Sequence, residues 1–150
     1  MYRGLLLVLA FALAMPITAK AETVADIMRE FGMLGTFADD CSQPPNKNNF
    51  HTVYAELPNG FVERIYYNEP GKIYSRYVLQ RVNRVSADQV FYQQKGSAGN
   101  IDVILQVAGD RYHVLSSQNE NGTAYVQNGR YTSATSAPGR ESTWQTKCHD

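Results

Sequence analysis

The residue types that most often carry catalysis are few and scattered in this chain. The three histidines, His51, His113 and His149, form neither His-x-His nor His-Glu-x-x-His, so the spacing typical of zinc ligands is absent. The stretch Gly96–Gly99 contains a serine between glycines but lacks the spacing of a nucleophile elbow. No phosphate loop or dinucleotide fingerprint occurs. The sequence therefore predicts no catalytic residues, no metal site and no cofactor, and we expect a protein that is not an enzyme.

Paired carboxylates occur once, at Asp39 and Asp40. Adjacent residues of a strand point to opposite faces, so these two side chains would not share one substrate. We expect them to accept hydrogen bonds from backbone or arginine donors near a strand end.

Tyrosine is the more unusual feature of the composition. Of the ten tyrosines, nine follow the N-terminal segment: Tyr54, Tyr66, Tyr67, Tyr74, Tyr77, Tyr92, Tyr112, Tyr125 and Tyr131. A tyrosine packs as an aromatic ring and hydrogen-bonds at its tip, which suits the wall of a half-wet cavity or an interface. Tyrosine is also a favourable strand residue, so its abundance has a purely structural explanation as well.

A small ligand is the chemistry that these residues favour most. Tyr74 and Arg76 would share one face of a strand and offer a ring and a cation to an anionic or aromatic ligand. The candidate ligand-binding residues are Tyr74, Arg76, Phe91, Val103 and Leu105. The alternative for Arg76 is a solvated run of charge together with Arg81 and Arg84.

The N-terminal segment has the layout of a secretory signal peptide. Arg3 precedes an uninterrupted apolar run from Gly4 to Ala14, and small residues at 19 and 21 suit a cleavage site. A membrane span needs about 20 apolar residues, and this run is shorter. We expect a signal peptide at 1–21, a mature domain at 22–150, a periplasmic or secreted location, and no stable membrane insertion after cleavage.

Charge narrows the choice of partners. The chain has 14 basic and 14 acidic residues, and removal of Arg3 and Lys20 leaves a formal charge of −2. Nucleic-acid binding needs a basic surface that neutralises phosphates, so a nucleic-acid partner is not expected.

Two cysteines, Cys41 and Cys148, stand near the two ends of the mature chain. In an exported protein such a pair normally forms a disulfide. The alternative is a metal site, for which His149 beside Cys148 is the only neighbouring ligand. A disulfide would close a loop of roughly 100 residues and stabilise the fold by about 4–5 kcal/mol in the chain-entropy model. It would also hold the first and last elements side by side.

Hydrophobic periodicity predicts one helix and then strands. Apolar residues recur at helical spacing from Val24 to Phe31, with Thr23 as N-cap and Gly32 as terminator. Later segments are rich in Tyr, Val, Ile and Thr and are separated by short turns. The expected strands are Gly35–Cys41, Phe50–Leu57, Phe61–Asn68, Ile73–Val85, Gln89–Lys95, Ile101–Ala108, Arg111–Ser117, Thr123–Asn128 and Ser142–Lys147.

Connections of two to five residues join most of these strands, which predicts antiparallel neighbours in up-and-down order. The expected fold class is all-β: one antiparallel up-and-down barrel or flattened sandwich of about eight or nine strands, with a short N-terminal helix. The polar segment Ser42–Asn49 is the one long coil-like loop.

The ends of the mature chain resemble those of lipocalin-like, calycin-type small exported bacterial proteins of unassigned function. The motifs are Gly35-Thr36-Phe37 leading to Asp40-Cys41, and Trp144 followed by Lys147-Cys148. Phe37 takes the place of the tryptophan that calycins usually carry. The resemblance implies a barrel with bridged ends and implies no reaction.

Two functions follow from these expectations. The first is an exported, non-catalytic barrel that binds a small apolar or amphipathic ligand, because a barrel of eight strands is just wide enough for one. The second is an envelope protein-interaction or inhibitor module that acts through surface loops, such as Ser42–Asn49. Sequence cannot separate a cavity from a packed core, so it does not decide between them.

Overall fold

The computed structural model describes residues 21–96 and 99–149. The predicted signal peptide, except for Ala21, and the Ser97–Ala98 part of one predicted turn lie outside the described residues. Within the described part of the chain, no helix combines the length and apolarity needed to cross a membrane.

The predicted helix is present as α1 (Val24–Glu30). Thr23 and Asp26 form a capping box, in which the Thr23 hydroxyl accepts from Asp26 N at 3.1 Å and Thr23 N donates to the Asp26 carboxylate at 3.0 Å. Ala25, Ile27 and Met28 form the buried face. The helix therefore needs the sheet for stability, because seven residues would not remain helical alone.

Ten strands follow in the described residues, each at or near an expected position except for one. They are β1 (Gly35–Ala38), β2 (His51–Glu56), β3 (Val62–Glu69), β4 (Lys72–Arg84), β5 (Gln89–Gly96), β6 (Gly99–Ala108), β7 (Arg111–Asn119), β8 (Ala124–Gln127), β9 (Arg130–Tyr131) and β10 (Gln145–Lys147). The unexpected strand, β9, is a two-residue partner of β8 across the Asn128-Gly129 turn. Both turn residues have positive φ, 49° and 72°, as a tight hairpin turn requires.

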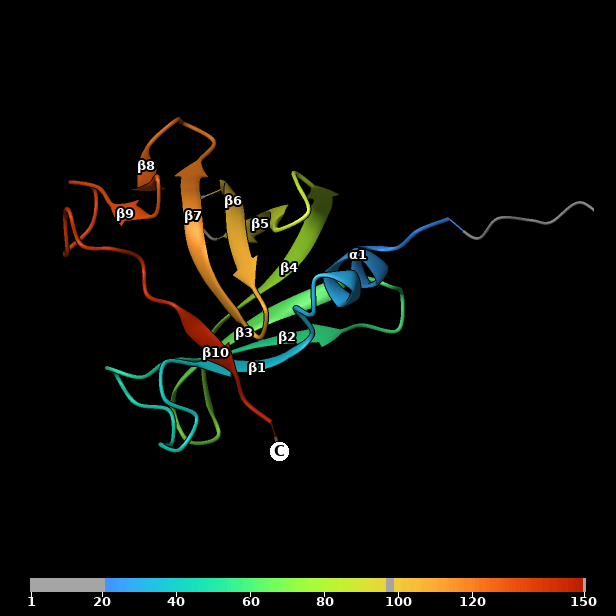
Figure 1. Ribbon diagram of the computed structural model, residues 1–150, viewed down its shortest axis with the longest axis horizontal. Coiled ribbons are helices and arrows are strands. Elements are labelled where there is room, and N and C mark those ends of the chain that lie inside the picture. The colour runs from blue at the N-terminus through green and yellow to red at the C-terminus, as the bar shows by residue number, and fades with distance from the viewer. Residues whose placement is uncertain (1–20, 97–98, 150) are drawn as a thin grey trace, which may run out of the picture.

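The sheet closes into a barrel. Strands β1 to β7 pair antiparallel in sequence order, and β10 pairs with both β1 and β7. Eight strands therefore form the closed wall, while β8 and β9 continue from the far part of β7, beyond the β10 contact (Figure 1). The predicted all-β class, the barrel and the short N-terminal helix are confirmed.

Side chains that alternate along the strands fill the barrel. Four aromatic rings that point inward, from Phe37, Tyr54, Tyr92 and Tyr112, are each at most 2% exposed. They meet edge to face, for example Phe37 with Tyr54 at 6.0 Å and Tyr54 with Tyr112 at 5.9 Å between centroids. Such pairs add about 0.5–1.5 kcal/mol each beyond the burial of their area.

Helix α1 lies at one end of the barrel. Ala25 N donates to Gly60 O at 2.9 Å, in the turn between β2 and β3. At the end of β4, Arg84 forms ion pairs with Glu22, which precedes the helix, and with Glu30, its last residue. Met28 of the helix and Met33 after it are buried. The helix and its flanking residues thus cover this end of the barrel, and a recess of about 450 Å³ lies beside the helix, with Phe31, Arg84 and Val107 in its lining.

A disulfide joins Cys41 to Cys148, with the Cα atoms 5.3 Å apart and a sequence separation of 107. The predicted bridge is therefore confirmed. It ties the segment after β1 to the residue after β10, two strands that are already hydrogen-bonded neighbours.

Candidate functional site

A half-open cavity of about 450 Å³ lies inside the barrel, at the end away from α1. Its rim comes from the β1–β2 connection, with Asp39, Asn48 and Phe50, and from the segment around β8 and β9, with Tyr125 and Tyr131. β10 pairs with the first part of β7, and β8 pairs with the last part. The barrel wall is therefore open along β7 between these two partners.

The cavity has an apolar wall and a polar floor. Ile101, Val103, Val114 and Val126 provide the aliphatic part. The polar part of the lining includes the buried residues Thr52, Arg64, Gln94 and Tyr112, which we call the floor. Tyr66, Ser117 and Gln145 also line the cavity and are half-buried. Ligand cavities in proteins commonly combine an apolar lining with a few placed polar groups.

Arg64 is the charged residue of the floor and is only 6% exposed. It lies in the middle of β3, and its register partners are Tyr54 on β2 and Tyr77 on β4. The guanidinium carbon lies 4.4 Å from the centroid of the Tyr66 ring and 5.7 Å from that of Tyr54, which is cation–π range. Three neighbouring strands thus fix this arginine inside the barrel.

Two buried polar atoms at the floor have no hydrogen-bond partner among the described residues: Arg64 Nε and Thr52 Oγ1. Arg64 Nη1 donates to Gln94 Oε1 at 3.1 Å. Burial raises the pKa of Tyr112, although nearby Arg64 lowers it. Buried polar groups in proteins are nearly always paired, so unpaired ones that share a cavity wall need an explanation.

Burial favours the neutral form of the Tyr54 and Tyr112 hydroxyls by raising the pKa of each. Burial raises the pKa of Tyr54 well above its usual value, despite the opposing effect of the nearby Arg64 cation. The Tyr54 and Tyr92 hydroxyls lie 3.4 Å apart, and the Tyr112 hydroxyl donates to Gln145 Oε1 at 2.5 Å. Of these tyrosines, Tyr112 lines the cavity, so its hydroxyl can orient a polar ligand atom.

The structure places the five predicted ligand-binding residues on two different faces. Val103 and Leu105 point into the barrel, and Val103 lines the cavity. Phe91 is on the outer face, where it pairs with Ile104 and carries the Arg81 guanidinium over its ring at 5.7 Å. The expected grouping of all five around one ligand is not formed.

Arg76 lies on the outer face, whereas Tyr74 stands at a register shift between β3 and β4, and neither residue lines the main cavity. Arg76 forms an ion pair with Glu63 at 3.3 Å and is more than half exposed. Tyr74 is 64% exposed and packs edge to face on Phe50 at 5.6 Å. It borders a smaller recess of about 340 Å³, which shares Phe50, Tyr66 and Gln94 with the lining of the main cavity.

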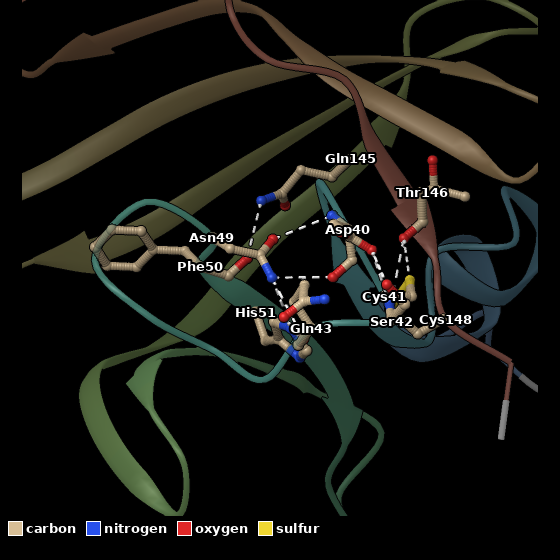
Figure 2. The surroundings of a disulfide bond; sticks show 10 residues. All are labelled: Asp40, Cys41, Ser42, Gln43, Asn49, Phe50, His51, Gln145, Thr146 and Cys148. Atoms are coloured by element: carbon tan, nitrogen blue, oxygen red, sulfur yellow. Dashed lines mark hydrogen bonds between the residues drawn. A yellow bond between two sulfur atoms is a disulfide. The ribbon is translucent and has the colours of Figure 1, made fainter.

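The polar loop 42–49 is held by one side chain, as Figure 2 shows. Asn49 Oδ1 accepts from Asp40 N at 3.1 Å, and Asn49 Nδ2 donates to Asp40 O at 2.9 Å. The Asp40 carboxylate accepts from the backbone and hydroxyl of Ser42, which lowers its pKa, so its expected structural role is confirmed. His51 Nε2 lies 3.0 Å from Gln43 O in the same network. The disulfide and Asn49 together fix the rim of the cavity next to Phe50.

His113 and Ser142 form the one close histidine–serine contact among the described residues, with Nδ1 and Oγ 2.9 Å apart. Ser142 Oγ donates its proton to Val114 O at 2.6 Å, so it accepts from the imidazole. The ring of His113 stacks on Trp144 with 4.1 Å between centroids. This arrangement fastens the segment before β10 to β7 and does not activate the serine as a nucleophile. In residues 21–96 and 99–149, no three His, Cys, Asp or Glu side chains gather as metal ligands.

Comparison with protein-family models, with curated proteins and with solved structures finds no match to this chain. The geometry of the cavity therefore carries the functional argument by itself.

Arg64 is the site residue that the sequence analysis did not select. A signal existed, because Val62, Arg64 and Tyr66 alternate along one face of the predicted strand. The opposite face, with Phe61, Glu63 and Ile65, has the same mixture of apolar and charged residues. Alternation alone therefore left both arginine and glutamate as candidates for the interior.

Proposed function

We propose that this protein is an exported, non-catalytic binding barrel that holds one small amphipathic ligand in the cavity at its helix-free end. The observation that carries the proposal is the half-open volume of about 450 Å³, with an aliphatic wall and a polar floor. A closed wall of eight strands fits this proposal, since a barrel of that size can hold one small ligand.

Two further features support the export and the resemblance. The Cys41–Cys148 bond favours an oxidising compartment, periplasmic or extracellular, as the predicted signal peptide does. An N-terminal helix followed by an up-and-down barrel with bridged ends supports the lipocalin-like resemblance, which stays part of the proposal.

The test uses a matched pair of tryptophan substitutions on β7. Ser117 lines the cavity, whereas its neighbour Ser116 pairs with Ile104 on the outer face. Ser117→Trp would fill the cavity, and Ser116→Trp would add the same ring outside. The probe is N-phenyl-1-naphthylamine, a neutral dye that fluoresces in apolar surroundings.

Saturable binding of one dye per wild-type molecule, kept in Ser116→Trp and weakened at least tenfold in Ser117→Trp, would support the cavity as the binding site. All three proteins must show the same cooperative thermal unfolding for the comparison to be valid. Equal dye binding by the two variants, or no binding by the wild type, would overturn the proposal.

A further inference from the structure

Arg64 carries a positive charge in the interior that no acidic side chain neutralises. None of the ion pairs among the described residues includes it. Asp39 is the sole acidic residue that lines the cavity, and it lies at the exposed rim without an ion pair to Arg64. Burial of an unpaired charge is among the costliest arrangements in a protein, so its presence in this floor calls for a function.

The surroundings of Arg64 compensate the charge only in part. Three tyrosine rings lie within cation–π range, those of Tyr54, Tyr66 and Tyr92, at 5.7, 4.4 and 5.7 Å. A guanidinium has five N–H donors, and Arg64 makes one side-chain hydrogen bond, to Gln94. Its Nε is buried out of solvent contact and has no partner, and the Arg64 side chain lines the cavity, where an acceptor would enter.

Thr52 adds a second, independent donor to the same floor. Its side chain is fully buried on β2, in register with Tyr66 on β3, and its hydroxyl is unpaired. Asn68 Oδ1 is the third unpaired buried polar atom among the described residues, and Asn68 does not line the cavity. A guanidinium without an acidic partner and an unpaired hydroxyl, both from residues that line one cavity, are groups that favour an oxyanion.

We propose that the floor formed by Arg64, Thr52 and Gln94 binds the carboxylate of an amphipathic monocarboxylic acid, whose apolar tail lies against Ile101, Val103 and Val114. This inference rests on the proposed function and names its ligand class. One carboxylate neutralises the single buried cation. A dianionic head group would neutralise Arg64 but leave one negative charge uncompensated. That charge would lie closer to the Asp39 carboxylate.

The test compares ligands that have the same tail and different heads. Decanoate, decan-1-ol, decylammonium and decyl phosphate are titrated at pH 8 against the wild-type protein loaded with N-phenyl-1-naphthylamine. We expect decanoate to displace the dye with a Kd at least tenfold below that of decanol, since charge-assisted hydrogen bonds are the stronger ones. Decyl phosphate and decylammonium should bind less tightly than decanoate.

Two arginine variants test whether Arg64 causes the preference for decanoate over decanol. Arg64→Met should reduce the ratio of decanol to decanoate Kd to about one, while dye binding persists. Arg76→Gln removes a cation from the outer face and should keep the wild-type ratio. Should Arg64→Met fail to fold, Thr52→Val, which replaces the hydroxyl by a methyl group, should weaken decanoate several-fold and leave decanol unchanged.

Thermal unfolding separates a functional role from a structural one. If Arg64 serves ligand binding and does not stabilise the fold, ligand-free Arg64→Met should unfold at the same temperature as the wild type or at a higher one. Decanoate should raise the unfolding temperature of the wild type and not that of Arg64→Met.

The two proposals fail in different ways. Absence of dye binding would overturn the binding barrel and this inference with it. Dye binding with equal affinity for decanoate and decanol would leave the binding barrel and overturn the carboxylate site. Tighter binding of decyl phosphate than of decanoate would overturn the assignment to a monoanion.

Discussion

Phe37 and Tyr112 meet edge to face, with ring centroids 5.0 Å apart and planes at 74°. Phe37 is on β1 and Tyr112 on β7, and these strands do not pair with each other, because β10 lies between them. The contact therefore spans the seam where the barrel closes. Both rings are 2% exposed, so the seam is a dry aromatic junction beneath the main-chain ladder of β10.

Removal of the ring at this seam should be costly. Phe37→Ala is expected to lower the free energy of unfolding by about 3–5 kcal/mol, the usual loss for a buried phenylalanine. Phe91→Ala, which removes the same ring from the outer face, should cost about 1 kcal/mol or less. Denaturant unfolding of the two oxidised variants provides the comparison. Equal losses would show that the seam ring is not a principal core contact.

The disulfide should stabilise the barrel by restricting the unfolded chain. The double variant Cys41→Ser, Cys148→Ser should lose up to about 4–5 kcal/mol in the chain-entropy model for a loop of this length. The measurement is denaturant unfolding with and without a reducing agent. Reduction should bring the wild type to the stability of the variant and leave the variant unchanged. A further loss in the reduced variant would mean that the reductant acts elsewhere.

Gly60 should be more sensitive to substitution than Gly71. Both have left-handed backbones, with φ of 79° and 71°, so alanine at either position costs about 1–2 kcal/mol from the backbone. A Cβ at Gly60 would also come within 2.9 Å of Thr23 Cγ2, whereas nothing lies within 4 Å at Gly71. Gly60→Ala should therefore unfold more readily than Gly71→Ala.

The reason for that difference can be checked with Thr23→Ser, which deletes the Cγ2 methyl group and keeps the capping hydroxyl. This change should restore part of the stability lost in Gly60→Ala and none of that lost in Gly71→Ala. A double-mutant cycle of the four proteins, read by thermal unfolding, measures the coupling. Zero coupling would place the strain of Gly60→Ala somewhere other than the α1 cap.

His113 should make stability depend on pH near neutrality. Burial lowers its pKa, although Ser142 and Glu141 oppose this shift. The unfolded histidine binds its proton near pH 6.5, and the folded one does so only at lower pH. The unfolded state therefore takes up protons first, so stability is greatest above about pH 6.5 and falls as the solution becomes more acidic.

The measurement is the unfolding temperature between pH 7.5 and 5.5, above the range in which most carboxylates titrate. His113→Gln should show a shallower decline over this interval than the wild type. A decline of equal steepness in both proteins would assign the pH dependence to other groups.

Local sequence determined where the elements of this protein begin and end. Thr23 and Asp26 form the capping box that starts α1, and Asn128-Gly129 supplies the positive φ values of the β8–β9 turn. Short connections enforced antiparallel order, and the two cysteines implied bridged ends. The cap and the turn each depend on a few adjacent residues, which a single sequence contains. The bridge was expected from the number of cysteines and from the predicted export.

Tertiary structure alone decided which face of each strand points inward. A period of two tells which residues share a face, but it does not tell whether that face is enclosed. The register shift at Tyr74 also interrupts the period by which Tyr74 and Arg76 were expected to share a face. In β5 both faces carry a large aromatic residue, Phe91 on one and Tyr92 on the other, so hydrophobicity gave no choice.

The functional floor depended on the same choice. Register with β2 and β4 turned Arg64 inward and Glu63 outward, and the irregular pairing between Leu79 and Arg81 changed which β4 residues follow the inner face. These pairings join residues far apart in the chain and are fixed when the barrel closes between β7, β10 and β1. Closure is a property of the whole sheet, so the buried cation and the cavity above it could be found only in the folded chain.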